Sequence, residues 1–568
     1  MSDAPQRGAP GDRDGARPGN GGDLLVRILR ENGVDTVFGV VSVHNLPLVE
    51  AVDRDLRFVA VRHEAAAVNA ADGHARAGGG LGCALTSTGT GAGNAAGSMI
   101  EALAAGSRVL HVTGNIDSAH LGRGRGVIHE TKDQLGMLTA VSKHAATITS
   151  AGTAASVLRT AIRHARTLPY GPVSVEWPID LQYAAQQDTG AGAENGPAVP
   201  RPDAAHTVST ARVAEIAARL AAARRPLIWA GGGARAAGGP LRALAERLGA
   251  PILTSNAGRG SVSEDHELVV GNFAASAAAQ PLLADADLLL SIGTHFRSNE
   301  TRHYALRLPE HHVQLDVDRD ALGRSYPVTD GLCGDAADLL PALLDHLPED
   351  GPTSEPGWRE RGVATRRAVR DRLRADIGPY AAICDAMRAH LEPGSPIARD
   401  VTIPSSQWGN RLLPIFDPAT NIFPVGGGIG QGLAMGIGAA LARPDVPALV
   451  IAGDGGLSVH LGELATLAQE RPWLVVVVFN DGGYGVLRNM QDAHMERRSG
   501  VDLFTPDFAA TARAMDMPYA LVRDAGDFAG AFAKAVAARE PSLLEVDVTA
   551  LGPVPVPFVP PVAIPGRT

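Results

Sequence analysis

Short apolar runs recur along most of the chain and are separated by longer amphipathic segments. The first amphipathic segment, 23–32, has apolar residues at helical spacing and ends at Gly33. Runs that predict strands follow it at 36–41, 58–61, 82–87, 108–113 and 173–176. The alternation returns further along the chain, with strand-like runs at 226–230, 251–254, 288–292 and 312–316. Strands that alternate with helices predict doubly wound parallel sheets.

A third stretch of the same kind contains two apolar runs that end in acidic, glycine-rich turns. The run 448–452 stops at a Gly-Asp-Gly turn around Asp454, and the run 474–479 stops at an Asn-Asp-Gly turn around Asp481. The segment between them is long enough for one crossover helix, so the strands should be parallel and end at the same edge of the sheet. Open α/β sheets bind ligands at that edge.

These patterns predict an α/β protein of three doubly wound parallel-sheet domains. A chain of 568 residues agrees with several domains, because single cores stop growing near 250–300 residues. We expect a disordered tail at 1–22, domains at 23–185, 206–345 and 375–550, linkers at 186–205 and 346–374, and a proline-rich tail at 551–568. Polar, Pro- and Gly-rich composition places the linkers.

Asp454 and Asp481 should face the same crevice of the third domain. Two carboxylates beside exposed glycine backbone suit Mg²⁺ that holds a diphosphate, because Mg²⁺ combines a few protein oxygens with phosphate oxygens. Each aspartate could instead only shape its turn. The sequence leaves this alternative open for either residue.

Composition narrows the class of partner. The formal net charge is −10 and no long basic run occurs, which argues against nucleic acid. No stretch approaches the roughly 18 apolar residues of a membrane span. The N-terminus lacks the apolar core of a signal peptide, and Cys83, Cys333 and Cys384 show no metal-ligand spacing. We therefore expect a cytoplasmic protein that acts on small molecules.

Three motifs together resemble the thiamine diphosphate (ThDP)-dependent enzymes. The turn at Asp454 followed by Asn480-Asp481 is similar to the family's GDG…NN fingerprint, with Asp481 at the position of the commoner asparagine. RHEAAAVNAADGHAR, at 62–76, resembles the segment of the activating glutamate, and PVGGGIGQG, at 424–432, resembles the cofactor loop. The pattern is most similar to acetolactate synthase-like and benzoylformate decarboxylase-like enzymes. The resemblance implies pyrimidine-binding, central and diphosphate-binding domains, in that order.

The resemblance also implies sites for ThDP and Mg²⁺. Glu64 would hydrogen-bond the pyrimidine N1′ and help the 4′-imino group take the proton from C2 to form an ylide. The same glutamate could instead only complement a helix N-terminus. Ile429 would force the cofactor into a V shape, and the carbonyl of Gly427 would accept a hydrogen bond from the 4′-amine. The other implied ligands are Ser405, Ser406, Gly455 and Gly456 for the phosphates, and Asp454, Asp481 and the Gly483 carbonyl for Mg²⁺.

The substrate side resembles its relatives less closely. Val43, beside His44, replaces an acidic residue of pyruvate decarboxylases, and Ser87 replaces the catalytic histidine of benzoylformate decarboxylases. His129 falls in the active-site loop of the synthase-like group and is a catalytic candidate; an ordinary surface-loop histidine is the alternative. In a helix expected over the site, Leu487 precedes Met490, which stands where acetolactate synthases carry tryptophan.

We expect a ThDP- and Mg²⁺-dependent decarboxylase and carboligase that transfers an enamine, formed from a 2-oxo acid, to an aldehyde or a second 2-oxo acid. Decarboxylation to a free aldehyde is the alternative. A glycine-rich turn at 231–236 nearly matches G-x-G-x-x-A, which allows FAD as a further cofactor, or a flavin- or NAD-dependent oxidoreductase. Tight strand–helix packing needs the same glycines. The resemblance further implies a homodimer or homotetramer in which Glu64 meets the diphosphate-binding domain of another subunit.

Overall fold

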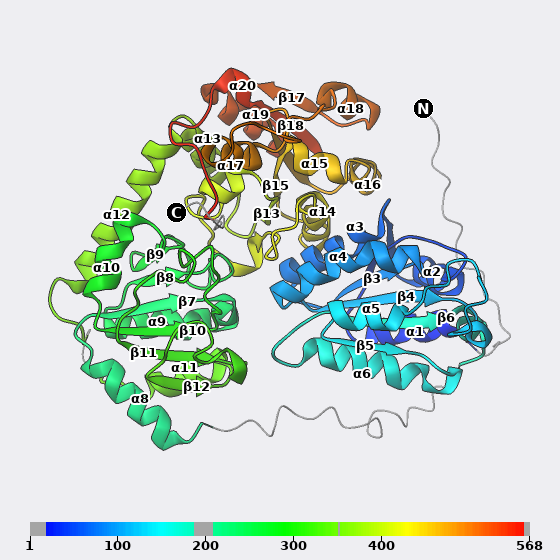
Figure 1. Ribbon diagram of the computed structural model, residues 1–568, viewed down its shortest axis with the longest axis horizontal. Coiled ribbons are helices and arrows are strands. Elements are labelled where there is room, and N and C mark those ends of the chain that lie inside the picture. The colour runs from blue at the N-terminus through cyan, green and yellow to red at the C-terminus, as the bar shows by residue number, and fades with distance from the viewer. Residues whose placement is uncertain (1–18, 187–207, 350–352, 562–568) are drawn as a thin grey trace.

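A computed structural model describes residues 19–186, 208–349 and 353–561, and it contains three six-stranded sheets. Every strand pair is parallel. Figure 1 shows each sheet with its own helices, the N-terminal one in blue and cyan, the central one in green and the C-terminal one in yellow to red. The prediction of three doubly wound α/β domains is confirmed.

The N-terminal sheet has the strand order β2-β1-β3-β4-β6-β5. Its strands are β1 (Thr36–Gly39), β2 (Arg57–Ala60), β3 (Gly82–Thr86), β4 (Val109–Asn115), β5 (His144–Thr147) and β6 (Val173–Pro178). Its helices include α1 (Gly21–Glu31), α2 (Leu46–Asp55), α3 (Glu64–Gly78), α4 (Thr90–Ala105), α5 (Gln134–Val141) and α6 (Ala154–Arg166). Apolar residues of α1, α2 and α6 form the core on one face, and those of α3 and α4 on the other.

The central sheet has the order β12-β11-β10-β7-β8-β9. Its strands are β7 (Pro226–Ala230), β8 (Ile252–Thr254), β9 (Val269–Gly271), β10 (Leu288–Ile292), β11 (His311–Asp316) and β12 (Asp330–Cys333). Its helices include α8 (Thr210–Ala222), α9 (Gly238–Leu248), α10 (Gln280–Asp285) and α11 (Ala336–Leu344). Helices α8, α9 and α11 supply the core of one face.

The C-terminal sheet has the order β14-β13-β15-β16-β18-β17. Its strands are β13 (Ile397–Arg399), β14 (Asn421–Ile422), β15 (Ala448–Gly453), β16 (Leu474–Asn480), β17 (Tyr519–Val522) and β18 (Ser542–Asp547). Its helices include α13 (Tyr380–Ala389), α14 (Gly432–Ala442), α15 (Asp454–Val459), α16 (Glu463–Glu470), α17 (Gly485–His494), α18 (Phe508–Ala514) and α19 (Ala525–Ala537). Strands β15 and β16 are almost entirely apolar, because a parallel sheet is covered on both faces.

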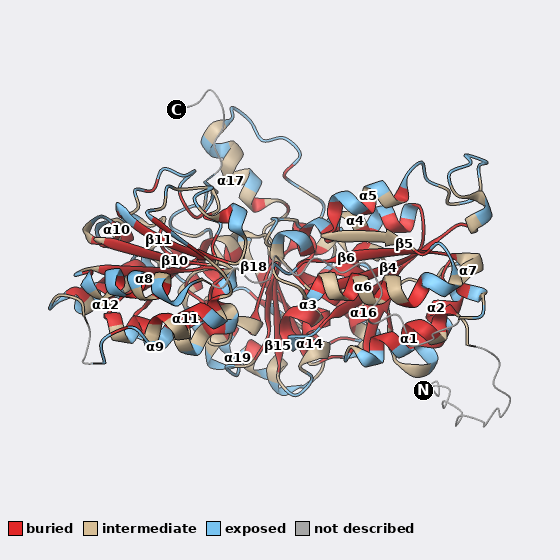
Figure 2. Ribbon diagram, turned by 90° about the horizontal axis from the view of Figure 1, so that it is seen from below, coloured by how far each residue is buried: buried red, intermediate tan, exposed pale blue. Residues whose placement is uncertain are grey.

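Burial follows this layering. In Figure 2 most strands are red, whereas the helices also carry pale blue. None of the helices within the described ranges has the length and apolarity to cross a membrane.

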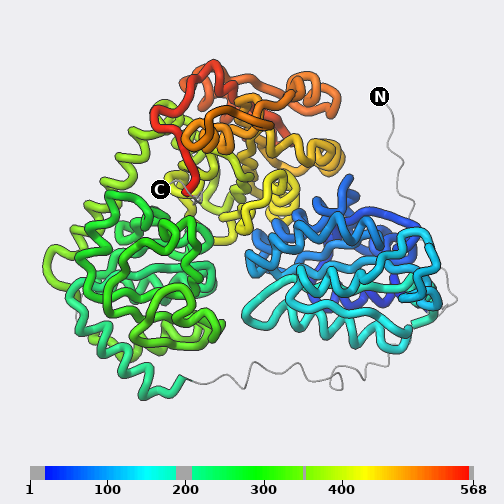
Figure 3. Tube along the Cα trace, in the orientation of Figure 1, coloured from blue at the N-terminus to red at the C-terminus, as the bar shows by residue number. Residues whose placement is uncertain are grey.

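Helices α3 and α14 join the first and third domains within one chain, and Figures 1 and 3 place both at this junction. A Cβ built on Gly438 would lie 1.9 Å from the carbonyl oxygen of Ala70, and one built on Gly73 would lie 2.1 Å from that of Met435. No larger residue fits at either position, so the two backbones can approach this closely only through glycine.

Two expected boundaries are corrected by the structure. Helix α1 begins at Gly21, inside the stretch expected as a tail, because Asn20 and Asp23 form a capping box around its first turn. The stretch expected as a linker, 346–374, contains most of α12 (Trp358–Ile377). Its polar, Pro- and Gly-rich beginning suggested a linker, but Trp358 and Val369 are buried in the core of the central domain. Residues 1–18 and 187–207 of the expected tail and first linker lie outside the described residues.

Candidate active site

Three neighbouring strands of the C-terminal sheet, β13, β15 and β16, end in turns that carry Asp400, Asp454 and Asp481. The backbone N–H of Asp481 donates to Oδ1 of Asp454 at 3.3 Å, so these two aspartates meet as the strand pattern predicts. Asp400, which the sequence pattern did not indicate, is 2% exposed and accepts hydrogen bonds from the N–H groups of Gly430 and Gly432, each at 3.0 Å. The edge of the sheet therefore gathers three carboxylates.

Asp454 and Asp481 form a carboxylate pair with little access to water. Burial and the charge of Asp454 raise the pKa of Asp481 to about 6, and burial raises the pKa of Asp454. Oδ2 of Asp454 is buried and has no hydrogen-bond partner within the described part of the chain. The carbonyl oxygen of Gly483 faces the same turn, since a Cβ built on Gly455 would lie 2.8 Å from it. A cation would stabilise the ionised form of this pair.

The segment from Pro424 to Gly432 forms an open loop beside this pair. Gly427 has φ +88°, and a Cβ built on it would meet nothing within 4 Å, so this peptide faces open space. The apolar side chain of Ile429 is 40% exposed. The end of the loop is held firmly, because Nδ1 of His460 donates to the carbonyl of Gly430 at 2.9 Å.

Ser405 and Ser406 lie in a short π-helix, Ser405–Gly409, which follows β13. π-Helices are rare and often occur at functional sites. Oγ of Ser405 is buried and, among the described residues, has no hydrogen-bond partner. An oxygen-rich ligand at this edge would satisfy it.

Glu64 is the first residue of α3, at the carboxyl edge of the N-terminal sheet. Its Oε2 accepts a hydrogen bond from Nδ2 of Asn94 at 3.0 Å, and a Cβ built on Gly91 would lie 2.8 Å from Oε1. The carboxylate therefore faces the start of α4 as well as heading its own helix. His63 caps α3 by accepting from the N–H of Ala65, which leaves Glu64 unneeded as the cap.

His44 and His129 meet at the same edge of the N-terminal sheet. Their Nδ1 atoms are 3.3 Å apart, and the rings contact edge to face with centroids 5.1 Å apart. Burial and the nearby His129 lower the pKa of His44. The loop of His129 packs onto Gly89, since a Cβ there would lie 2.3 Å from the carbonyl oxygen of His129. Gly89 is two residues before Gly91, so the histidine pair and Glu64 share one neighbourhood.

Comparisons with known proteins decide the family. Three profiles match in chain order: thiamine pyrophosphate enzyme, N-terminal TPP binding domain, at 19–137; central domain, at 213–343; and C-terminal TPP binding domain, at 404–546. A probable 2-ketoarginine decarboxylase of Pseudomonas aeruginosa is 35% identical over 503 residues, 87% of this chain and 88% of that one. The chain belongs to the thiamine pyrophosphate enzyme family. Thiamine pyrophosphate is another name for ThDP.

Other relatives in this family carry different activities in their names. A probable acetolactate synthase large subunit of Methanocaldococcus jannaschii is 27% identical, with coverage of 93% of this chain and 91% of that one. A pyruvate oxidase of Lactiplantibacillus plantarum is also 27% identical, over 94% of this chain and 89% of that one. The protein is a ThDP-dependent enzyme that acts on 2-oxo acids, and its individual reaction needs a separate argument.

The residues of this member fit ThDP and a divalent cation. Ser405 and Asp454 each present a buried oxygen without a partner in the described ranges, and these oxygens suit a phosphate and a metal. The open space at Gly427 and the protruding Ile429 suit an aromatic ring system. No group of three His, Cys, Asp or Glu side chains arranged for a metal occurs in the described segments. Two aspartates and a carbonyl leave the remaining Mg²⁺ positions to phosphate and water.

The candidate substrate residues are less tightly gathered. Ser87 is buried and packs near Gly91, next to Glu64. Val43 is 60% exposed beside His44, and Leu487 is 48% exposed on α17. Met490 lies on the same helix and is half-buried. Leu487 and Met490 thus lie on an open helix of the C-terminal domain, while the other candidates belong to the N-terminal domain.

Sequence reasoning missed four residues that shape the site. Asp400 and His460 hold the end of the cofactor loop, and Glu101 holds its start by accepting a hydrogen bond from the N–H of Gly426 at 2.6 Å. Arg488 of α17 donates to the carbonyls of Asp481 and Gly482 at 3.1 and 3.2 Å. Asp400 follows Ile397–Arg399, a strand too short and too polar to be predicted as an apolar run.

The glycine-rich turn of the central domain is filled by the chain itself. A Cβ built on Gly231 would lie 2.1 Å from the carbonyl oxygen of Gly293, and one on Gly233 would lie 2.8 Å from the Cα of Gly293. A 3₁₀ segment, Gly232–Ala237, follows the turn. Close packing therefore explains these glycines without a nucleotide.

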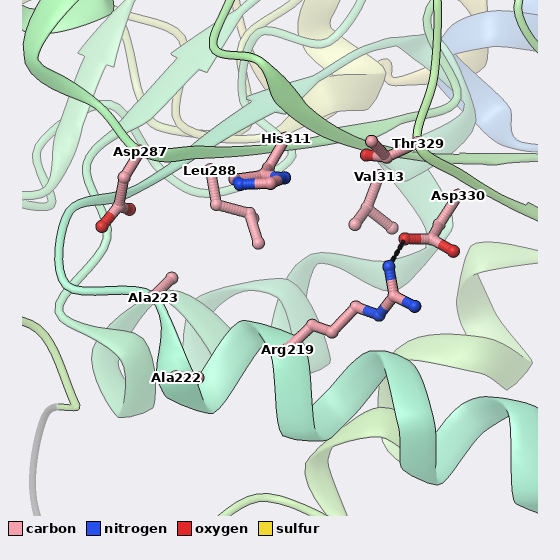
Figure 4. Close-up of a pocket in the computed structure, with 9 residues that line it drawn as sticks. All are labelled: Arg219, Ala222, Ala223, Asp287, Leu288, His311, Val313, Thr329 and Asp330. Atoms are coloured by element: carbon pink, nitrogen blue, oxygen red, sulfur yellow. Dashed lines mark hydrogen bonds and ion pairs between the residues drawn. The ribbon is translucent and has the colours of Figure 1, made fainter.

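A cavity of about 440 Å³ opens at the opposite, amino-terminal edge of the central sheet (Figure 4). Leu288 and Val313 form its apolar part, and Arg219 and Asp330, bonded to each other, lie on its wall. Both oxygens of Asp330 are paired, one with Arg212 and one with Arg219, each at 2.5 Å. No unpaired charge remains on Asp330 to recognise a ligand, and the cavity contains none of the predicted site residues.

Proposed function

We propose that this enzyme decarboxylates a 2-oxo acid, with ThDP and Mg²⁺, and releases an aldehyde. The contact between His44 and His129 carries the proposal. Two touching imidazoles at the same edge of the N-terminal sheet as Glu64 can pass a proton to a ligand held there, and an aldehyde forms only when the carbon left by CO₂ is protonated. The 2-ketoarginine decarboxylase relative agrees with this reaction.

Glu64 would hold the pyrimidine ring through N1′ and share a proton with it. ThDP, when bound, supplies the carbanion that adds to the keto carbon and accepts the electrons released with CO₂. The carbonyl of Gly427 would accept a hydrogen bond from the 4′-amine, and Ile429 would support the bend between the two rings. Ser87 and Val43 would line the substrate side together with the histidines.

Asp454, Asp481 and the carbonyl of Gly483 would bind Mg²⁺, which in turn would hold the diphosphate. The N–H groups of Gly455 and Gly456 and the hydroxyls of Ser405 and Ser406 would bind phosphate oxygens. Arg488 would add positive charge from α17, where it already lies 3.6 Å from Oδ2 of Asp481. Leu487 and Met490 of the same helix would then cover the substrate.

Carboligation is the second candidate function. It is supported by the acetolactate synthase relatives, and it needs the same residues up to loss of CO₂. The two reactions differ in whether the histidines deliver a proton before a second carbonyl compound arrives. A flavin- or NAD-dependent oxidoreductase is not proposed, because close packing of Gly231 and Gly233 against Gly293 accounts for the glycines that suggested it.

A homodimer or higher homo-oligomer would complete the site. Helix α4, whose first turns lie against Glu64, has an exposed face with small and apolar residues. On this face Gly93 and Gly97 have open space over them, and Ile100 and Leu103 are 54% and 38% exposed. Covering such a face would remove apolar surface from water and bring Glu64 to a second copy.

Mass spectrometry of products tests the proposal. The purified enzyme with ThDP and Mg²⁺ would be given 2-ketoarginine, pyruvate and benzoylformate, each with and without an added aldehyde. We expect CO₂ and the matching free aldehyde from at least one acid, with little change when an acceptor is added. A ligated product as the main species would establish carboligation instead. If no product forms unless a reductant or oxidant is added, both decarboxylation to an aldehyde and carboligation are contradicted.

A further inference from the structure

The start of the cofactor loop is held by side chains from outside its own domain. Oε1 of Glu101, on α4 of the N-terminal domain, accepts from the N–H of Gly426 at 2.6 Å. Arg297 of the central domain donates to the carbonyl of Val425, the preceding residue. Arg76 of α3 donates to the carbonyl of Phe423 at 2.7 Å. Both other domains therefore contact this short segment.

Glu101 is the acidic member of this set and is unusually placed. Its side chain belongs to a residue only 2% exposed, and burial raises the pKa of its carboxyl, opposed by hydrogen bonds from the loop and by the charge of Arg76. Arg76 is itself paired with Asp72, through bonds of 2.8 and 2.6 Å. A buried carboxyl that faces backbone N–H groups is costly unless those contacts are kept.

The carboxyl also packs against the backbone of the loop. A Cβ built on Gly426 would lie 2.8 Å from Oε2 of Glu101, so the glycine backbone rests directly on the carboxyl. One residue later, Gly427 has φ +88° and open space on its free side. Asp400 and His460 hold the far end at Gly430. Hydrogen bonds therefore hold the loop on both sides of Gly427, at Gly426 and at Gly430.

We propose that Glu101 is a positioning residue, which aims the carbonyl of Gly427 at the 4′-amine of ThDP by holding the N–H of the preceding residue, Gly426. This inference rests on the role of Gly427 in the proposed function. It assigns to the N-terminal domain a second task beside that of Glu64, and this task is performed on the cofactor loop of the same chain.

Binding of two cofactor forms tests the assignment. Titration calorimetry with Mg²⁺ would compare ThDP with its analogue that lacks the 4′-amino group, for the wild type and Glu101→Gln. One misaimed hydrogen bond should weaken ThDP binding about tenfold. The analogue, which cannot make that bond, should lose less than about twofold by the same reasoning. Equal losses for both forms would show a merely structural role, and no loss for either would remove the assignment.

Amide hydrogen exchange gives a measurement without cofactor. In Glu101→Gln the N–H of Gly426 should exchange faster, while those of Gly430 and Gly432, held by Asp400, should stay protected. Glu50→Gln, an exposed change on α2, is the matched control and should alter neither exchange nor binding. Unchanged exchange at Gly426 would contradict the inference.

A conservative variant covers the case in which Glu101→Gln does not fold. Glu101→Asp keeps the charge but draws the carboxyl back from Gly426, so it should lie between the wild type and the glutamine variant in ThDP affinity. A wild-type affinity for Glu101→Asp together with wild-type exchange would also overturn the assignment. Failure of the wild type to bind ThDP would instead contradict the proposed function.

Discussion

The two aspartates at the edge of the C-terminal sheet have opposing requirements. Burial favours their neutral forms, whereas a shared cation would favour both carboxylates. Their strands and turns are local features, which is why the sequence predicted that Asp454 and Asp481 would meet. Glu101 could not be predicted in this way, because its partner Gly426 is 325 residues away in the chain.

Asp454→Asn should abolish Mg²⁺-dependent retention of ThDP. The amide supplies one neutral oxygen in place of a carboxylate. Loss of a residue that only contacts a metal ligand already lowers metal affinity 10–100-fold, so we expect Mg²⁺ affinity to fall by roughly 100-fold or more. Calorimetry with and without Mg²⁺ measures this change. Asp445→Asn, in an exposed turn before β15, is the control. If the Asp454 variant retained ThDP with wild-type affinity, the metal assignment would be wrong.

Glu64→Gln should separate binding from catalysis. Glutamine keeps the shape of the side chain but cannot take up a proton in the same way, so we expect turnover to fall by about 10²–10⁴-fold. ThDP affinity should change little. Nuclear magnetic resonance of hydrogen exchange at C2 of bound ThDP, beside steady-state rates, would measure both effects. Normal turnover in this variant would refute the role given to Glu64.

At the scale of elements, the sequence predicted the apolar strands well and the short or polar ones poorly. Strands β15 and β16 are continuous apolar runs and were predicted, whereas β9 and β12 have three and four residues and were not. The glycine-rich start of α14 was interpreted as part of the cofactor loop, and its packing partner α3 lies in another domain and had no local signal. The fold class was therefore readable from pattern, and the domain junction was not.

Gly438→Val should destabilise this junction. A branched side chain would collide with the carbonyl of Ala70, and overpacking of this kind costs about 3 kcal/mol. Differential scanning calorimetry should show a lower Tm for the transition that involves α14. Gly530→Ala, on an exposed face of α19 with nothing within 4 Å of its Cβ, is the control and should raise stability slightly. An unchanged Tm for Gly438→Val would mean that the helices do not meet this closely.

In the whole molecule, the two halves of the site lie in different domains. Glu64 and the histidine pair belong to the N-terminal domain, while the metal turns belong to the C-terminal one. The contacts of Glu64 described above are with Asn94 and Gly91 of its own domain. A single sequence cannot show which copy of the chain supplies each half, so the prediction of a dimer rested on resemblance.

Ile100→Asp should weaken self-association. A charge on the exposed face of α4 would have to be buried in a dimer, which is costly without a partner. Light scattering after size exclusion should give a dimer or tetramer for the wild type and a shift to monomer for the variant, with activity that rises with protein concentration. Leu521→Asp, on the edge strand β17, is a control of the same kind. A monomeric wild type with full activity would contradict the shared site.

The contacts of Glu101, Arg76 and Arg297 with residues 423–426 have a consequence for protein engineering. Exchanging a single domain with that of a relative would separate this loop from Glu101, Arg76 or Arg297, even if the new domain folded correctly. Chimeras should therefore lose coenzyme affinity unless the transplanted domain carries the matching side chains. These contacts thus limit where members of this family can be recombined.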